Sequence, residues 1–289
     1  MDLGRISLLG FSALMNSLSE KERSSLLELL PAKEKDSFYQ APKLTIDLLF
    51  SDEIIQFLEA VHPSWLHFIF EKYSPKDQRI LIHAFHSQYS TLLKLLNLQD
   101  DPLQLTAFSQ QFIREKAYLQ LINLKEGVDP IYAIHQEPFF TLLKIPAERW
   151  ERFIIYLSLY DLKEEIKTLI DKNKLKTIQE YFSKSQLEFL KKIGKQKQAI
   201  TFSPMGLQNW NGKIEEFVSI LKTRGLNRLA KSLTYASESF CWHLFLLLAV
   251  DDAKILKKLM VTKIDPVVEK ELELQLKEAY AFFQQHEEP

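Results

Sequence analysis

Apolar residues recur at intervals of three and four along most of the chain, which is the spacing of one face of an α-helix. The pattern is clear after Ser19, where a serine–glutamate capping pair precedes a leucine-rich run over residues 26–30. A polar cap followed by paired apolar positions returns at 74–85 and at 183–193. Runs with the period-two alternation of strands are scarce. The sequence therefore predicts an almost wholly α-helical protein.

The segments 19–30 and 74–85 share one order of cap, lysine, acid and paired apolar residues. This order favours stacked helical units that bury a continuous core, although any two capped amphipathic helices would share it. Breaks rich in proline, glycine and asparagine divide the chain into two or three subdomains. We predict an N-terminal helical domain over 1–100, a middle helical domain with a lysine-rich end over 101–198, and a C-terminal helical domain over 199–289.

Glycine is rare, with seven residues in 289, which is about a third of the usual ~7%. Phosphate-cradling loops and nucleophile elbows use the positive φ that glycine adopts at low cost. No Walker, dinucleotide or G-x-S-x-G pattern is present in the chain. We therefore expect a protein that is not an enzyme and that needs no cofactor.

Histidine and cysteine give only a weak indication of a metal site or a nucleophile. His83 and His86 lie three residues apart on a predicted helix, but no HExxH or CxxC motif accompanies them. The single cysteine, Cys241, lies inside an apolar run, where burial would raise the pKa of its thiol. No metal site is predicted. A lone cysteine is also typical of proteins in a reducing compartment.

The longest apolar run covers residues 240–250, and its 11 residues are too few for the ~20 that cross a bilayer. It predicts a buried helix that is apolar all round. The apolar run near the N-terminus lacks a small-residue cleavage site, so we expect no signal peptide. With 37 basic and 38 acidic side chains, the chain has almost no net charge, so no overall electrostatic field would attract it to nucleic acid. These features predict a soluble, cytoplasmic protein.

Residues 163–197 hold ten lysines and five acidic residues. This segment is either a docking surface for an acidic partner or for lipid phosphates, or a solvated helical face. The four tryptophans are predicted as core anchors, although tryptophan also dominates the hot spots of protein interfaces.

Two segments resemble a known family. Residues 60–76 read AVHPSWLHFIFEKYSPK, and residues 225–233 read GLNRLAKSL, followed by Ala236-Ser237-Glu238 and Asp265-Pro266-Val267. The first segment resembles the middle domain, and the second the C-terminal domain, of the flagellar motor-switch rotor proteins (the FliG family). The resemblance covers about 100 residues, in the order that the family keeps.

The resemblance implies stacked armadillo-like helices, no catalysis, and a place in a cytoplasmic ring at the base of a membrane machine. It implies a rotor-like C-terminal domain, protein components of a basal ring as partners, and peripheral association with the inner membrane through that complex. The residues that we assign to partner binding on this basis are His62, Pro63, Trp65, Leu66, Arg224, Arg228, Lys231 and Trp242.

The chain departs from the family at residues that carry charge or polar contacts. Val61 replaces a glutamate and Ser64 a glutamine, and the run 240–250 has no formal charge with His243 neutral. In the rotor family, the helix at this position carries charges that act against the stator of the motor. A surface without charges cannot steer such an oppositely charged stator. We therefore expect a non-flagellar type III secretion adaptor that links the membrane ring to a sorting platform.

Two other functions remain open from the sequence. A helical-repeat regulator or chaperone would hold a peptide or a partner helix in a groove. An enzyme with an unfamiliar helical site would place His83 and His86 beside carboxylates in a polar pocket.

Overall fold

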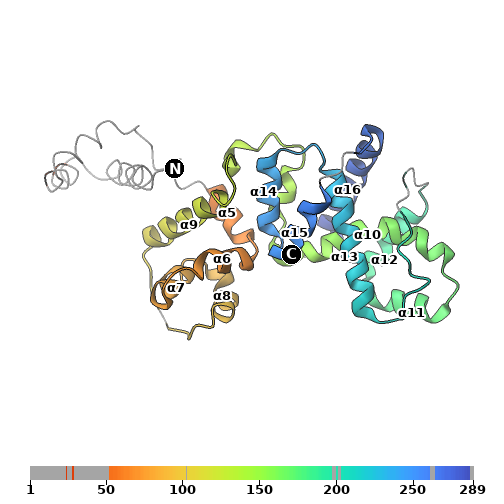
Figure 1. The fold of residues 1–289 in the computed structure, drawn as a ribbon, viewed down its shortest axis with the longest axis horizontal. Helices are drawn as coiled ribbons and strands as arrows, with labels where there is room; N and C mark the ends of the chain where they lie inside the picture. The colour runs from red at the N-terminus through yellow and green to blue at the C-terminus, as the bar shows by residue number, and fades with distance from the viewer. Residues whose placement is uncertain are drawn as a thin grey trace. The chain divides into compact units, whose positions relative to one another are not determined.

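The computed structural model describes residues 52–101, 103–196, 200, 203–260 and 264–286, together with Ser24 and Glu28 (Figure 1). Over these residues every regular element is an α-helix or a 3₁₀-helix. The predicted all-α class is thus confirmed, whereas the stacking of helices as repeats stays a prediction. The predicted capped helix that begins at Ser19 lies outside the described residues, apart from the helical positions Ser24 and Glu28.

The described chain forms two compact units, each of which is made from two stretches of sequence. The first unit holds residues 52–59 and 73–120, and the second holds residues 60–72 and 121–286. The three-domain division expected from the sequence stays a prediction.

Over its described residues, the first unit is built from four helices of nine residues or fewer and one of 16 residues. They are α5 (Asp52–Ala60), α7 (Pro75–Ile82), the 3₁₀-helix η1 (His86–Gln88), α8 (Tyr89–Leu95) and α9 (Ala107–Ile122). Its core includes Leu58, Leu92 and Tyr118, and the Tyr118 ring lies edge-on to Phe57 with 6.1 Å between centroids. The side-chain amide of Gln88 donates to the carbonyls of residues 58 and 59, so η1 is tied to the end of α5.

Two of the predicted helix starts are confirmed. Ser74 is the N-cap of α7, with its hydroxyl 3.2 Å from the N–H of Asp77 and Pro75 at the first helical position. Ser183 is the N-cap of a helix in the second unit, where its hydroxyl and the side chain of Gln186 form a reciprocal capping box. Both caps satisfy main-chain N–H groups that have no acceptor within the helix.

The second unit contains the remaining elements. They are α6 (Pro63–Phe70), η2 (Ile131–Ala133), η3 (Phe140–Lys144), α10 (Ala147–Thr168), α11 (Lys172–Tyr181), α12 (Lys184–Gly194), α13 (Ile214–Ser232), α14 (Glu238–Leu247), α15 (Val250–Leu259) and α16 (Pro266–His286). Helix α10 lies at the centre, where α12, α13 and α16 pack against it, and α13 also packs against α15 and α16 (Figure 1). A helix covered on several sides must be apolar on several sides, and α10 is buried almost continuously from Phe153 to Lys163.

An aromatic cluster fills the space between α10, α12 and α16. The rings of Phe153 and Phe283 lie 5.3 Å apart between centroids, and those of Phe189 and Phe282 lie 4.9 Å apart. Tyr156 packs against three of these rings. Burial of each such side chain stabilises the fold by about 1.5–3 kcal/mol, so this cluster anchors α16 to the central helix.

Helices α10 and α13 approach each other closely at Gly225. A Cβ atom at this position would lie 2.0 Å from the carbonyl oxygen of Ile154 and 2.6 Å from its Cγ2 atom. Gly225 is therefore needed for space rather than for an unusual φ, because it lies in the middle of a regular helix.

Helix α14 confirms the prediction of a buried apolar helix, since nine of its ten residues are buried. Burial raises the pKa of the Cys241 thiol to about 12, so this group stays protonated at neutral pH. Among the helices of the described residues, none is long and apolar enough to span a bilayer.

Candidate functional site

The first group of predicted partner-binding residues forms a corner at the start of α6. His62 is the N-cap, with extended backbone angles (φ −66°, ψ 131°), and Pro63 is the first helical residue. The imidazole Nδ1 atom of His62 lies 3.2 Å from the N–H of Ser64 and 2.8 Å from its hydroxyl. Proline suits this position because its φ matches the helix and the first N–H needs no acceptor. We call residues 62–65 the α6 corner.

The α6 corner docks on the C-terminal end of α14. The N–H of His62 donates to the carbonyl of Leu246 at 2.9 Å. The indole N–H of Trp65 donates to the carbonyls of Phe245 and Leu248, at 3.1 and 2.9 Å. The last carbonyls of an α-helix lack partners within the helix. The corner therefore acts as a C-cap supplied from a segment about 180 residues away in the sequence.

The same corner also caps the start of α15. The hydroxyl of Ser64 accepts the N–H of Val250 at 3.2 Å. The residue that precedes α15, Ala249, offers no side chain for this purpose. Ser64 thus takes the role that a local serine or aspartate usually has, and it joins α6 to the turn between α14 and α15.

Trp65 and Trp242 meet inside the second unit. Their rings lie 5.9 Å apart in an edge-to-face arrangement, and the indole N–H of Trp242 donates to the carbonyl of Leu121. Trp242 is 8% exposed and Leu66 is fully buried. In this structure these predicted residues therefore bind their own chain, and their contact with another protein stays a prediction.

The other predicted residues lie on α13, and their hydrogen bonds reach different parts of the unit. Arg224 donates to the carbonyl of Pro204 at 2.6 Å, and Lys231 to that of Leu259 at 3.4 Å. Arg228 is 2% exposed and pairs with Asp161 at 2.6 Å. These three bonds do not involve the α6 corner, so the structure brings together only part of the predicted set.

The electrostatic surroundings of His62 favour the neutral imidazole. Burial lowers the pKa of His62, the carboxylate of Asp252 opposes that shift, and the ammonium of Lys222 adds to it. The two charged groups are paired with each other at 2.8 Å, and their effects on the ring oppose each other. Desolvation therefore decides the direction of the shift. In α14, burial lowers the pKa of His243 to about 4.

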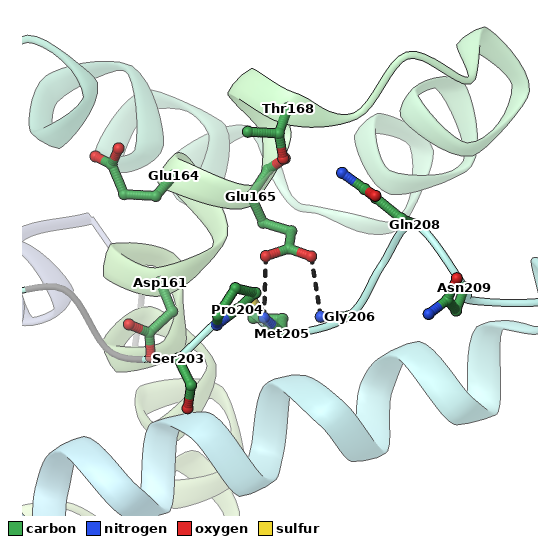
Figure 2. Close-up of a pocket in the computed structure, with 10 residues that line it drawn as sticks. All are labelled: Asp161, Glu164, Glu165, Thr168, Ser203, Pro204, Met205, Gly206, Gln208 and Asn209. Carbon is green, nitrogen blue, oxygen red and sulfur yellow. Dashed lines mark hydrogen bonds between the residues drawn. The ribbon is translucent and has the colours of Figure 1, made fainter.

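A pocket of about 500 Å³ lies between α10 and the loop that precedes α13 (Figure 2). Its lining residues are Asp161, Glu164, Glu165, Thr168, Ser203, Pro204, Met205, Gly206, Gln208 and Asn209. Figure 2 shows the carboxylate of Glu165 directed at the loop, where it accepts the N–H groups of Met205 and Gly206 at 2.9 Å. It also accepts the N–H of Leu207 at 2.8 Å. Glu165 thus holds three consecutive amides of this loop.

The other two carboxylates of the pocket also have partners within the chain. Asp161 pairs with Arg228, and Glu164 pairs with Lys167 at 2.9 Å. Glu164 and Glu165 are adjacent in the sequence, and their carboxylates take different partners although both line the pocket. Glu165 therefore fastens the loop to α10, and Asp161 fastens α13 to it.

The two histidines considered for a metal are placed differently from each other. His83 ends α7 and lies 2.9 Å from the carbonyl of Asp101, with its ring 4.8 Å from that of Tyr89. His86 begins η1. Within the described part of the chain, no group of three or more histidine, cysteine, aspartate or glutamate residues is arranged to hold a metal ion.

Several lysines of the segment 163–197 are used inside the second unit. Lys163 is buried and donates to the carbonyl of Ile193 at the end of α12, and burial lowers the pKa of its ammonium. Lys174 donates to the carbonyl of Gln208, and Lys192 pairs with Glu278 at 3.1 Å. Part of the lysine-rich segment is therefore structural, and a docking role for the rest stays a prediction.

Sequence reasoning missed Ser64 as a functional residue, because the N–H that it caps lies 186 residues further along the chain. No local pattern marks such a residue, since Ser64 is an ordinary second position of a helix. Comparisons of this chain with protein-family models, with curated proteins and with solved structures found no match.

Proposed function

We propose that this protein is a non-catalytic structural adaptor in a cytoplasmic ring or sorting platform at the base of a type III secretion or flagellar-type apparatus. The observation that supports it most is the α6 corner. The two segments that resemble the rotor family lie far apart in the sequence, yet α6 from one packs on α14 and α15, which lie between the parts of the other. Both α6 and the second segment therefore belong to one compact unit.

A binding role also agrees with how the second unit uses its polar groups. The pocket carboxylates hold a loop and an arginine, and the corner side chains cap two helices. A body in which buried polar groups are bonded internally keeps one shape, and a rigid surface loses little conformational entropy when it binds a partner.

Helix α6 presents one aromatic side chain for a partner. Leu66, Ile69 and Phe70 are buried, whereas Phe68 is 39% exposed. The ammonium of Lys72 lies 4.7 Å from the centroid of the Phe68 ring, which gives this surface an aromatic centre with a basic edge. We therefore place the partner contact of α6 at Phe68 and Lys72.

The test is recovery of the tagged full-length protein from cross-linked native membranes, with the partners identified by mass spectrometry. We expect components of a secretion or flagellar basal ring to be recovered with it. Replacement of Phe68 by glutamate should lower that recovery at least tenfold, because loss of an aromatic hot spot costs about 2 kcal/mol.

Tyr132→Glu is the matched control, because Tyr132 is 46% exposed in the same unit but lies on η2. This variant should recover the ring components as well as the unaltered protein does. Circular dichroism should show equal helix content in both variants. Recovery of the protein without any ring component would refute the adaptor role, and recovery of a single soluble partner would favour a helical-repeat regulator or chaperone.

A further inference from the structure

The contacts of His62 define the protonation state of its ring. A main-chain N–H can only donate, and that of Ser64 points at Nδ1 of His62 over 3.2 Å. Nδ1 must therefore be an acceptor without a proton, which leaves the proton of the neutral ring on Nε2. The Ser64 hydroxyl, 2.8 Å from Nδ1, then donates to the ring, while its oxygen accepts the N–H of Val250.

We propose that the α6 corner is a pH-sensitive latch, in which protonation of His62 releases α6 from the turn between α14 and α15. A proton on Nδ1 removes the acceptor that caps α6 and directs an N–H at the N–H of Ser64. The Ser64 hydroxyl can no longer donate to the ring either. The Ser64 oxygen can turn to accept the new N–H, but the Nδ1 acceptor for the Ser64 N–H is lost, so protonation weakens the closed corner whatever partner the protein binds.

The charged groups around His62 do not compensate for this loss. Asp252 of α15 and Lys222 of α13 act on the ring with opposite signs and are paired with each other at 2.8 Å. In α14, burial lowers the pKa of His243 to about 4 and raises the pKa of the Cys241 thiol to about 12, so neither group carries charge at neutral pH. No unpaired carboxylate among these groups would stabilise an imidazolium. Burial lowers the pKa of His62, in agreement with the direction that the hydrogen bonds require.

The sign of the pH effect follows from this direction. When the corner is open, His62 has its ordinary pKa of about 6.5, and when it is closed the pKa is lower. The closed corner therefore has its full stability above pH 6.5 and loses it as the pH falls towards the lower pKa. Opening frees the carbonyls at the end of α14 and separates Trp65 from Trp242.

Hydrogen exchange of the full-length protein between pH 7.5 and 5.0 tests the latch. The amides of His62 and Val250 report on it directly, because their hydrogen bonds cross the α6 corner. After correction for intrinsic exchange, the opening constant should rise by up to tenfold for each unit of pH below 6.5. Nitrogen NMR of the imidazole should show the proton on Nε2 at pH 7.5.

Two variants isolate the contribution of His62. His62→Asn keeps a side-chain acceptor for the N-cap but cannot titrate, so its corner should stay closed at pH 5.0. His67→Asn changes a histidine on the same helix outside the corner and should respond to pH like the unaltered protein. His243 is present in both variants and cannot account for a difference between them.

Three results would overturn the latch: protection of both amides that does not change from pH 7.5 to 5.0, an equal pH response in His62→Asn and the unaltered protein, or a proton on Nδ1 at pH 7.5. If His62→Asn opens the corner at every pH, the NMR titration of the unaltered protein decides between the latch and a purely structural role of His62. For the latch to hold, the pKa of His62 must lie below 6.5, and the change in the Trp65 indole signal must have its midpoint at the same pH.

Discussion

Replacement of Asp161 by alanine should lower the free energy of unfolding of the second unit by about 3–5 kcal/mol, the usual cost of breaking a buried ion pair. Asp161 and Arg228 join α10 to α13 at 2.6 Å, with side chains that are 5% and 2% exposed. Without the carboxylate, the guanidinium stays buried next to the Gln275 amide and the Tyr160 ring, neither of which carries a compensating charge. The large effect follows because the desolvated guanidinium loses the carboxylate that is 2.6 Å away.

Urea unfolding followed by tryptophan fluorescence measures this effect on the second unit alone, because all four tryptophans of the chain lie in it. The double variant Asp161→Leu with Arg228→Met is the control for the ion pair. It removes both charges, so it should cost less than Asp161→Ala. A double variant whose loss equals the sum of the losses of Asp161→Leu and Arg228→Met, each measured alone, would contradict a coupled pair. A loss below 1 kcal/mol for Asp161→Ala would contradict it as well.

Gly225→Ala should destabilise the same unit by about 2–3 kcal/mol, although alanine is the better helix former by about 1 kcal/mol. The added Cβ would lie 2.0 Å from the carbonyl oxygen of Ile154, which belongs to the backbone of the central helix. A side chain can rotate away from such a contact, but a helix backbone can only shift as a whole. We therefore expect α10 and α13 to separate locally, at the cost of the packing around them.

Gly194→Ala is the matched control, because Gly194 is also helical and a Cβ there meets nothing within 4 Å. This substitution should leave the stability unchanged or raise it by up to about 1 kcal/mol through helix propensity. The measurement is the midpoint of urea unfolding for both variants under the same conditions. Equal midpoints for Gly225→Ala and Gly194→Ala would show that the close approach of the two helices carries no strain.

The helices could be predicted because their signals are local. The caps at Ser74 and Ser183 act on amides three residues away, and the structure has both. The apolar run 240–250 has no polar face, and α14 is accordingly buried. Periodicity and capping depend on neighbours within one or two turns, so the sequence alone was sufficient for these elements.

The role of each charged residue could not be predicted in the same way. Arg228 follows the pattern of a helix surface residue, yet it is buried because Asp161 and Gln275 face it from two other helices. Glu165 stands beside Glu164 in a charged stretch, yet only Glu165 binds the loop amides. The role and the exposure of such groups depend on partners 40 to 67 residues away, about which a local pattern carries no information.

By itself, the sequence determined the all-α class, the start of several helices and the burial of one apolar helix, because the forces involved act between near neighbours in the chain. Only the tertiary structure decided that the α6 corner closes on α14 and α15, and that Ser64 caps Val250. Those contacts depend on which unsatisfied helix ends the packed fold brings together, and a hydrogen bond across 180 residues leaves no periodic trace.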